Sequence, residues 1–308
     1  MTAPDDGFRS GFVTVVGRPN VGKSTLVNRL VGQKVSIVSD RPQTTRSAIR
    51  GVRTTDTSQI VFVDTPGLHR PRTLLGERTN QRARDALDEV DVICVVVEAN
   101  AAYGPGDRFA ADLARAAHTP AVLVINKLDA ATPDQILDHL ASAAGELGEF
   151  DAYIPLSART GDGVPALVEE LEPRLPPGPR YFPDGVVTDQ PETFLAAELV
   201  REQLLRVARD ELPHSIAVTV EPDDDPPAGR DDSDGDLLRL LVTIRVERES
   251  QKGIVIGKGG AVLKGALTEA RRELEALLGT RVYMATRVKV ERDWQRRPQS
   301  LDRLGFDA

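Results

Sequence analysis

Residues 12–25 read FVTVVGRPNVGKST, an apolar run that leads into a glycine-rich turn and the start of a helical pattern. From Gly17 to Ser24 the turn matches G-x-x-x-x-G-K-[ST], the P-loop pattern between a strand and a helix. Gly17 and Gly22 let the backbone curl so that its N–H groups point at phosphate oxygens. Lys23 is placed to bridge the β- and γ-phosphates, and the Ser24 hydroxyl to bind Mg²⁺. This stretch therefore predicts a nucleotide-binding domain of the α/β class.

Strand-like and helix-like segments alternate through the first 175 residues. Such alternation places helices on both faces of a mostly parallel sheet, so we assign residues 1–175 to a P-loop nucleotide-binding domain. The expected strands are residues 12–16, 59–63, 91–97, 121–125 and 152–156, and the expected helices are 23–30, 106–117 and 133–147.

The alternation ends at five prolines between residues 173 and 183. Proline breaks helices and cannot pair in a central strand, so we interpret residues 176–190 as a stiff linker. Residues 191–308 show a second pattern, typical of a smaller α+β domain, with an acidic, Pro- and Gly-rich insert at 222–236 that we expect to be a solvated loop. The expected elements are helices at 192–210 and 261–278 and strands at 215–220, 237–246 and 281–290, with an apolar turn before a glycine-rich turn at 257–260.

Charge is distributed unevenly, although the net charge of the 308 residues is −8. Residues 237–308 hold 15 Lys and Arg against 9 Asp and Glu, a balance of +6. Residues 221–236 hold 8 acidic residues and one Arg, a balance of −7. The C-terminal part can therefore present a basic surface beside an acidic loop, and the global charge does not exclude a nucleic-acid partner.

Several classes of protein are disfavoured by the composition. The single cysteine, Cys94, excludes an internal disulfide and lies in the apolar run DVICVVV, so we expect a buried structural thiol. The four histidines show no metal-ligand spacing, so no zinc site is expected. No apolar run is long enough to cross a bilayer and residues 1–10 lack the pattern of a secretion signal, so we expect a cytoplasmic protein.

Residues 126–129, NKLD, specify the base. They follow the predicted strand 121–125, where the Asp129 carboxylate can accept hydrogen bonds from both N1–H and the 2-amino group of guanine. Adenine offers neither donor, so Asp129 would be left unpaired with ATP. Asn126 suits the purine edge and the loop backbone, the Lys127 stem can lie over the ring, and residues 157–159 can close over guanine with backbone N–H groups. The expected ligand is therefore GTP.

Two further segments are placed to handle Mg²⁺ and the γ-phosphate. Asp64 of the D-T-P-G segment at 64–67 is expected to hold Mg²⁺ through water, and Gly67 to offer its N–H to the γ-phosphate. Thr45, in the segment QTTR at 43–46, is the favoured second Mg²⁺ hydroxyl, with Thr44 as the alternative. The predicted Mg²⁺ ligands are Ser24, Thr45 and Asp64, and the predicted catalytic residues are Lys23, Thr45, Asn20 and Gly67. The predicted GTP contacts are Gly17, Arg18, Pro19, Asn20, Val21, Gly22, Lys23, Ser24, Thr25, Asp64, Thr65, Pro66, Gly67, Leu68, Asn126, Lys127, Asp129, Ser157 and Ala158.

Leu68 stands directly after the D-T-P-G segment, where Ras-type GTPases carry the glutamine that orients water. Leucine cannot hydrogen-bond water, so intrinsic hydrolysis is expected to be slow. Asn20 of the P-loop is a candidate ligand for a K⁺ ion that would stabilise charge in the transition state. The alternative is that Asn20 only shapes the loop.

The segment GKGG at 257–260 fits the G-x-x-G loop of an RNA-binding domain. Glycines let a nucleic-acid backbone approach closely, so that Lys258 and the following helix meet phosphates. The predicted RNA contacts are Lys252, Gly257, Lys258, Gly259, Gly260, Lys264 and Arg271. Trp294 could stack on bases or anchor the C-terminal segment, and the acidic insert could modulate RNA binding.

With both halves in view, the chain resembles the Era family of bacterial GTPases over nearly its full length. The matching segments are GRPNVGKST, QTTR, DTPG, NKLD and SAR in the first half, and VERESQKGIVIGKGG and VKVERDW in the second. The resemblance implies a G domain followed by a type II KH domain, of order α-β-β-α-α-β, that binds single-stranded RNA near the 3′ end of 16S rRNA. It further implies a role in maturation of the small (30S) ribosomal subunit and some peripheral association with the cell membrane. We expect a monomer.

Three functions remain in competition at this point. The first is a switch enzyme, in which GTP orders residues 43–46 and 64–72 and thereby permits RNA binding. The second is an RNA-binding module that holds nucleotide without useful turnover, which Leu68 keeps open. The third is a membrane-peripheral signalling GTPase. The sequence does not favour it, because it shows neither an amphipathic basic helix nor a lipidation motif.

Overall fold

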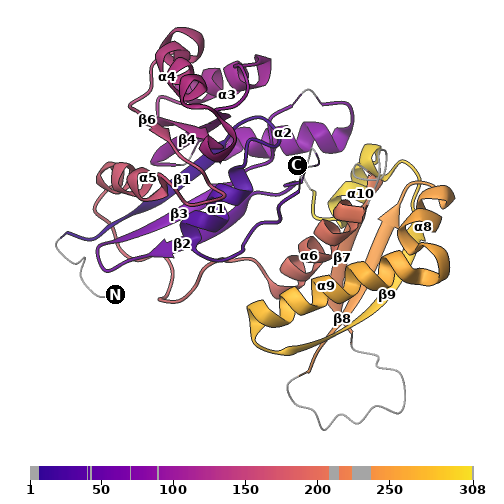
Figure 1. The fold of residues 1–308 in the computed structure, drawn as a ribbon. Helices are drawn as coiled ribbons and strands as arrows, with labels where there is room; N and C mark the ends of the chain where they lie inside the picture. The colour runs from indigo at the N-terminus through magenta and orange to yellow at the C-terminus, as the bar shows by residue number, and fades with distance from the viewer. Residues whose placement is uncertain are drawn as a thin grey trace. The chain divides into compact units, whose positions relative to one another are not determined.

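The computed structural model describes residues 7–39, 41, 44–69, 71–88, 90–207, 215–223 and 237–306. The chain divides into two compact units (Figure 1). The first unit comprises Met1–Arg72 and Gly76–Asp189, and the second comprises Thr73–Leu75 and Gln190–Ala308. No described helix is long and apolar enough to cross a membrane.

A six-stranded sheet forms the centre of the first unit, in the order β2-β3-β1-β4-β5-β6. All neighbouring strands run parallel except β2, which is antiparallel to β3 and was not predicted from the sequence. Its sequence, IRGVRT, contains a glycine and two arginines, as suits an edge strand better than a buried one. The strands are β1 Arg9–Val16, β2 Ile49–Thr54, β3 Ser58–Asp64, β4 Val92–Glu98, β5 Ala121–Asn126 and β6 Ala152–Pro155.

Helices cover both faces of this sheet, as the alternation predicts (Figure 1). On β4, Cys94 and Val96 face the core shared with α1 (Lys23–Val31) and α5 (Val164–Leu171). The intervening residues face the second core, which holds residues of α3 (Pro105–Ala116) and α4 (Pro133–Leu147), with α2 (Leu74–Asp85) also contributing. Burial raises the pKa of the Cys94 thiol to about 12, which confirms the inert structural cysteine that its position predicts.

The proline-rich segment 176–189 lies along the first unit instead of leaving it. Ser10 N–H donates to the Pro176 carbonyl (3.1 Å), and Val52 N–H on β2 donates to the Val187 carbonyl (2.8 Å). Between these points the Gln59 side chain binds the backbone of residues 181 and 182 through three hydrogen bonds of 2.7–2.9 Å. The segment therefore contacts the first residues of β1 and β3, at Ser10 and Gln59, and reaches the edge strand β2, which follows the predicted switch threonine.

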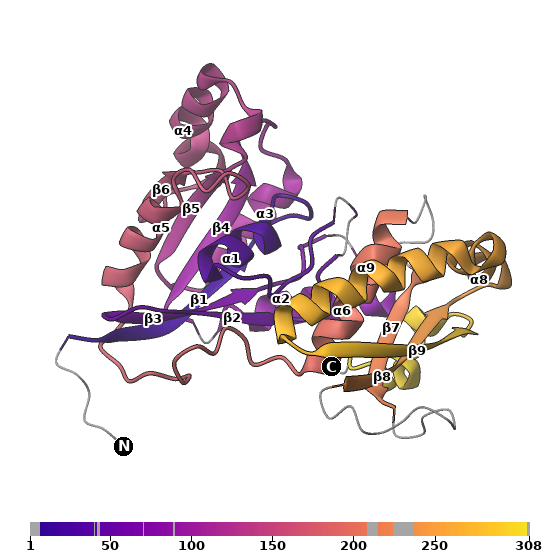
Figure 2. The ribbon, with the colours of Figure 1, turned by 60° about the horizontal axis from the view of Figure 1, so that its bottom comes forward.

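The second unit is a three-stranded sheet in the strand order β7-β8-β9, with α6 and α9 on one face (Figure 2) and α10 packed near Ala217 of β7 on the other. β7 pairs antiparallel with β8, and β8 pairs parallel with β9. The core between the sheet and the helices α6 and α9 includes Val200, Val242 and Ala270. The elements are α6 Glu192–Val207, β7 Ala217–Pro222, β8 Leu237–Val246, α8 Glu249–Ile256, α9 Ala261–Leu278, β9 Arg281–Val290 and α10 Pro298–Arg303.

Two expectations for this unit need comment. The apolar turn expected before the GKGG segment is wrong, because residues 249–256 form the helix α8, in agreement with the α-β-β-α-α-β order that the family resemblance implies. The predicted helix over 192–210 is observed as far as Val207, and residues 208–210 lie outside the described residues, as do residues 224–236 of the acidic insert.

Trp294 is an anchor of the C-terminal segment. Its side chain is fully buried, its Nε1–H donates to the Ser215 carbonyl (3.0 Å), and its ring stacks at 6.3 Å from Phe306. Leu301 of α10 and Ala217 of β7 belong to the same small core. A ring enclosed in this way offers no face to a base, so the stacking alternative for Trp294 does not hold.

Candidate nucleotide site and nucleic-acid interface

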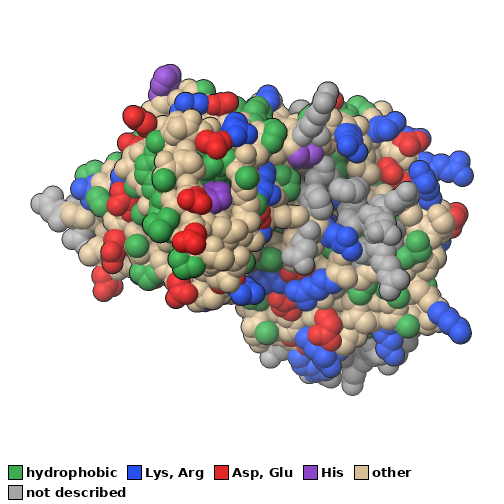
Figure 3. All heavy atoms as spheres, turned by 45° about the horizontal axis from the view of Figure 1, so that its top comes forward, with side chains coloured by type: hydrophobic (Ala, Val, Ile, Leu, Met, Phe, Trp, Pro, Cys, Tyr) green, Lys and Arg blue, Asp and Glu red, His purple; other side chains and the backbone are tan. Residues whose placement is uncertain are grey.

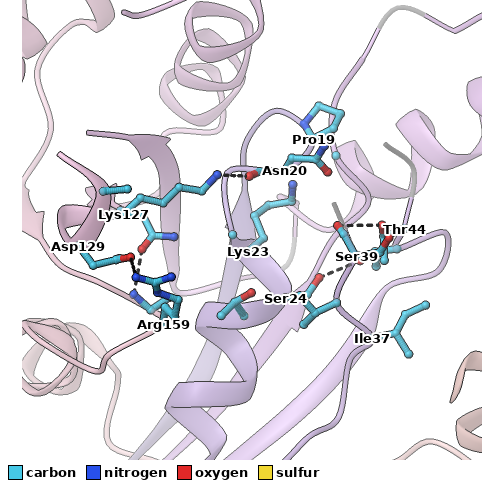
Figure 4. Close-up of a pocket in the computed structure, with 18 of the residues that line it drawn as sticks. Pro19, Asn20, Lys23, Ser24, Ile37, Ser39, Thr44, Lys127, Asp129 and Arg159 are labelled. Atoms are coloured by element: carbon cyan, nitrogen blue, oxygen red, sulfur yellow. Dashed lines mark hydrogen bonds and ion pairs between the residues drawn. The ribbon is translucent and has the colours of Figure 1, made fainter. Parts of the chain in front are cut away.

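The loops that follow β1, β3, β5 and β6 meet at the carboxyl edge of the parallel strands, where α/β sheets bind ligands. A cavity of about 570 Å³ opens there, within the size range of small-molecule sites (Figure 4). Its lining residues are Pro19, Asn20, Gly22, Lys23, Ser24, Thr25, Ile37, Val38, Ser39, Thr44, Thr45, Gly67, Asn100, Asn126, Lys127, Asp129, Ala130, Ala158 and Arg159.

The P-loop places a buried lysine at the floor of this cavity. Lys23 Nζ donates to the carbonyls of Gly17 (3.1 Å) and Arg18 (3.0 Å), and only 6% of the residue is exposed. Burial lowers the pKa of Lys23 to about 8, against the opposing attraction of Asp64. An anionic phosphate in the cavity would stabilise the charged amine, so the site favours the ligand that its motif predicts.

Glycine is required at the end of the same loop. Gly22 has a φ of 98°, and a β-carbon on it would lie 2.3 Å from Nδ2 of Asn126. A larger residue would therefore be strained in its backbone and would also displace Asn126. The P-loop and the base-binding loop are in direct contact at this point.

Three side chains with oxygen atoms that could bind a metal ion lie close together near Lys23. The hydroxyls of Ser24 and Thr45 lie 3.0 Å apart, and Thr45 Oγ1 donates to Asp64 Oδ2 at 3.3 Å. Asp64 is fully buried, burial raises its pKa, and its Oδ1 accepts no hydrogen bond from the described part of the chain. Hydroxyl and carboxylate oxygens are the donors that Mg²⁺ prefers, and a cation would relieve the buried carboxylate, so this donor set fits Mg²⁺.

The structure distinguishes between the two candidate switch threonines. Thr44 Oγ1 donates to the carbonyl of Arg41 at 2.6 Å, within its own loop. Figure 4 shows Thr44 beside Ser39 and Ser24 linked toward the neighbouring threonine. Thr45, the favoured candidate, is the one that lies with Ser24 and Asp64.

Asp129 lies at the other end of the cavity, with its carboxylate facing the loop after β6 (Figure 4). Ser157 Oγ donates to its Oδ1 at 2.5 Å, and the Arg159 guanidinium pairs with its Oδ2 at 2.7 Å. The Arg159 side chain is 76% exposed. Since guanine brings two N–H donors of the same geometry, the base can take the place of this exposed arginine on Asp129.

Asn126 lines the cavity and joins the loops around it. Its Nδ2 donates to the Val21 carbonyl (2.8 Å) and its Oδ1 accepts from the Ala158 N–H (2.9 Å), with 2% of the residue exposed. Only the backbone contacts expected for Asn126 are therefore seen. The same amide holds the P-loop and the SAR segment in register with NKLD.

Glu98, at the end of β4, was missed by sequence reasoning because no motif contains it. It forms ion pairs with both Arg18 and Lys127. Burial alone would raise the pKa of Glu98, but hydrogen bonds from Lys127 and Arg18 outweigh it and lower the pKa. Lys127 Nζ also donates to the Asn20 carbonyl (2.7 Å), so Glu98 links the phosphate half of the site to the base half. Ile37, Val38, Ser39 and Asn100 were missed for the same reason.

Several predicted contacts do not line the cavity with their side chains. Arg18 turns away and pairs with Asp107 at 3.1 Å. Thr65 Oγ1 donates to the Val15 carbonyl at 2.7 Å. Leu68 is 1% exposed within the core, and its N–H donates to the Gly17 carbonyl at 3.2 Å. The predicted contacts absent from the lining are Gly17, Arg18, Val21, Asp64, Thr65, Pro66, Leu68 and Ser157.

The GKGG segment forms an open turn between α8 and α9. Gly257, Gly259 and Gly260 have φ values of 73°, 61° and 78°, and nothing lies within 4 Å of a β-carbon built on Gly259 or Gly260. Lys258, Lys264 and Arg271 are exposed and Lys252 is half-buried. On the face shown in Figure 3, Lys and Arg predominate over the second unit, whereas acidic side chains are scattered over the first. The turn therefore combines close backbone access with positive charge.

Titration of Lys23 generates a prediction for nucleotide binding. Because burial lowers the pKa of Lys23 to about 8 in the free protein and bound phosphate raises it, GDP binding should take up more protons through Lys23 at pH 8.5 than at pH 7. Affinity therefore falls as the pH rises above 8. Calorimetry in buffers of different ionisation enthalpy measures this uptake. The variant Lys23→Met should show none, and an equal, near-zero uptake by the wild type at both pH values would contradict the assignment.

Comparison with known proteins agrees with this geometry. The family described as "50S ribosome-binding GTPase" matches residues 12–127, and the family described as "KH domain" matches residues 211–295. The GTPase Era of Mycobacterium bovis is 51% identical over 302 residues, covering 97% of this chain and 99% of the relative. The GTPase Era of Mycolicibacterium smegmatis is 50% identical over 301 residues, with the same coverage.

Two solved structures share the whole fold. A point variant of Aquifex aeolicus Era bound to GDP·AlF4⁻ superposes with a TM-score of 0.92 at 37% identity, covering 98% of this chain and 100% of that one. Era in complex with MgGDPNP and nucleotides 1506–1542 of 16S ribosomal RNA superposes with a TM-score of 0.91 at the same identity and coverage. With the G-domain and KH-domain geometry described above, these similarities place the chain in the Era family of GTPases, enzymes that hydrolyse GTP.

Proposed function

We propose that this GTPase is a nucleotide-controlled switch that binds 16S rRNA near its 3′ end through the KH domain and assists maturation of the 30S subunit. The observation that supports it most is the open GKGG turn, with Gly259 and Gly260 clear of any neighbour within 4 Å, in a chain with a complete GTP site. A relative of 37% identity was solved with both MgGDPNP and a 16S rRNA fragment. The family matched by the G domain is described as binding the 50S subunit. The rRNA in the solved Era complex is 16S rRNA, which belongs to the small subunit.

The switch would operate through residues that already meet in the cavity. Ser24, Thr45 and, through water, Asp64 would hold Mg²⁺ when it binds with GTP, and the ion would offset the negative charge of the phosphates. Thr45 and Gly67 lie on loops after α1 and β3, and only the γ-phosphate gives both loops a common partner. Gly67 fits this role because it lies against Pro19, where a β-carbon would come within 2.8 Å of the Pro19 Cα. Loss of the γ-phosphate would therefore release the segment that leads into β2.

The rate of hydrolysis is proposed to be slow without help. Leu68 is 1% exposed in the core, so its side chain cannot reach a water at the γ-phosphate. Lys23 stabilises the charge that develops on the phosphate oxygens, and Gly67 offers a backbone N–H. Asn20 lines the cavity with a φ of 67°, and we propose that its side chain contributes to a K⁺ site beside the phosphates.

The K⁺ proposal is tested by single-turnover GTP hydrolysis in matched KCl and NaCl buffers. We expect hydrolysis to be about tenfold or more faster in KCl, since one added charge at the transition state has an effect of that size. Asn20→Gly removes the side chain while permitting the left-handed φ, and should lose the KCl advantage with little change in GDP affinity. Equal rates of the wild type in the two salts would overturn the K⁺ role and leave Asn20 as a residue that shapes the loop.

RNA binding is tested at the GKGG turn itself. The double variant Lys258→Asp and Gly259→Asp places two anionic side chains in an exposed turn, where a β-carbon at Gly259 meets no neighbour. Asp at Gly259 must adopt a φ of 61°, a left-handed conformation that Asp tolerates better than most residues. We expect at least about a tenfold loss of affinity for a 16S 3′-end RNA, because both substitutions repel phosphates. Gly279→Asp is the matched control, since Gly279 also has a positive φ (67°) and open space, at the opposite end of α9. Equal RNA affinity in the double variant, the control and the wild type would rule out the turn as the interface.

Peripheral association with the inner face of the cell membrane, a cytoplasmic location and a monomeric state complete the proposal. All three rest on the resemblance to the Era family.

A further inference from the structure

The KH sheet has a second face that the RNA-binding turn does not use. β8 and β9 pair in parallel from Leu237 opposite Arg281 to Val246 opposite Val290. Side chains of a strand alternate between the two faces of a sheet. The even-numbered positions of both strands face the core with α6 and α9, as Leu240, Val242 and Val282 show, being 0–3% exposed. The odd-numbered positions therefore form the opposite face, which Figure 2 shows turned away from α9.

This opposite face, termed the outer sheet face, is strongly cationic. Its strand residues include five Arg and Lys and only one acid, Glu221. Two further acids flank the strands: Asp223 directly follows β7, and Glu291 directly follows β9 and pairs with Arg245 and Arg303. Ala217 on β7 also belongs to this face, but it is buried against Trp294 and Leu301 of the C-terminal segment. The other residues of the outer sheet face are Thr219 and Glu221 on β7, Leu237, Arg239, Leu241, Thr243 and Arg245 on β8, and Arg281, Tyr283, Ala285, Arg287 and Lys289 on β9.

The arrangement opposes the stability of the sheet. Lys289 stands directly opposite Arg245 in the register, and like charges in that position destabilise a sheet. Burial lowers the pKa of Arg245, and the neighbouring cations Arg303 and Arg287 lower it further, against Glu291. A surface that served only solubility would mix both signs. An anionic ligand would relieve this repulsion.

Two of the arginines are ordered by hydrogen bonds to the sheet; the side chain of Arg287 is 44% exposed, whereas that of Arg245 is 12% exposed. Arg287 Nε donates to Thr243 Oγ1 (2.7 Å), and its NH2 pairs with Glu221 (2.8 Å). Arg245 NH1 donates to Thr219 Oγ1 at 2.7 Å. Threonine hydroxyls of the adjoining strands thus fix both guanidinium groups on the sheet. Ordered side chains lose less conformational entropy on binding, and guanidinium groups match the geometry of phosphate oxygens.

The composition of the face favours RNA over a lipid surface. A protein that binds membranes peripherally adds inserted apolar side chains to its cations. Among the described residues, the large exposed hydrophobic side chains are Val38, Phe109, Leu137, Tyr181, Val207 and Ile254, and none lies on the outer sheet face. Tyr283, which stands opposite Arg239, is partly buried.

We propose that the outer sheet face is a second RNA-binding surface, which holds the sugar–phosphate backbone of a segment other than the one at the GKGG turn. The inference rests on the RNA binding proposed above and extends it, because the two surfaces lie on opposite sides of one sheet. The outer sheet face would contribute affinity and positioning without reading bases, since phosphate contacts carry no sequence information. An RNA long enough to reach both surfaces would then bind more tightly, and with a steeper salt dependence, than one confined to the turn.

The test uses the full chain and two RNAs. One RNA spans nucleotides 1506–1542 of 16S rRNA, and the other is a short single-stranded oligonucleotide from its 3′ end. The test variant carries Arg281→Gln, Arg287→Gln and Lys289→Gln, three exposed positions of β9. The control carries Arg108→Gln, Arg115→Gln and Arg180→Gln, three arginines of the first unit whose side chains are 41–48% exposed. Anisotropy titrations over a range of KCl concentrations give the affinity and its salt slope.

For the long RNA we expect the salt slope of the test variant to fall by about 2 to 3, with about a tenfold or greater loss of affinity at low salt. The short RNA and the control variant should behave as the wild type does. An unchanged slope for the long RNA would overturn the proposal, and so would equal losses for both RNAs, which would mean that the surfaces are not separate. Failure of the wild type to bind either RNA would instead refute the proposed function.

Binding to anionic vesicles tests whether the outer sheet face binds a lipid surface instead of RNA. The same variants are sedimented with vesicles that contain phosphatidylglycerol. Loss of vesicle binding in the test variant, with RNA slopes unchanged, would assign the outer sheet face to the membrane and contradict the RNA proposal.

Discussion

One buried amide holds the nucleotide site together. Asn126 donates to the Val21 carbonyl of the P-loop and accepts from the Ala158 N–H of the loop after β6, with 2.8 and 2.9 Å between the atoms. Gly22 must be glycine because a β-carbon would lie 2.3 Å from that amide. Since these loops follow β1, β5 and β6 of one parallel sheet, the sheet sets their spacing and Asn126 locks it. Phosphate and base recognition therefore depend on a contact that touches neither.

Two buried charged groups of the nucleotide site, Lys23 and Asp64, each lack a full set of partners within the described part of the chain until a ligand binds. Burial lowers the pKa of Lys23 to about 8 and raises that of Asp64, so each group is disfavoured in its charged form without a partner. Phosphate would relieve the first and Mg²⁺ the second, which ties nucleotide binding to the loops that bring Thr45 and Gly67 to the cavity. β2 follows one of these loops and holds the segment that leads to the KH domain through Val187. Changes at the γ-phosphate thus have a physical route along the first unit.

Sequence reasoning reached the parts of the site that rest on local motifs. The P-loop, NKLD and the buried strands follow from residue type and spacing alone, and the preference for Thr45 over Thr44 agrees with the geometry at Ser24. It missed Glu98, because its partners Arg18 and Lys127 come from two separate loops. It missed β2, whose short, mixed sequence gains its structure from a neighbouring strand. Residue pattern alone also predicted an apolar turn where α8 lies, whereas the family resemblance implied a helix there. The docking of residues 176–189 also depends on tertiary contacts, here those of Gln59, that proline content does not predict.

The central claim is that the nucleotide controls access to RNA. The most direct test is the affinity of the full chain for the 16S fragment 1506–1542 in three states, with MgGDPNP, with MgGDP and without nucleotide. We expect MgGDPNP to raise the RNA affinity by about 5- to 150-fold over MgGDP, the usual range of coupling between two sites. By linkage, the RNA should raise the ratio of MgGDPNP affinity to MgGDP affinity by the same factor. Equal RNA affinity in all three states would contradict it and leave a GTPase and an RNA-binding domain joined without communication.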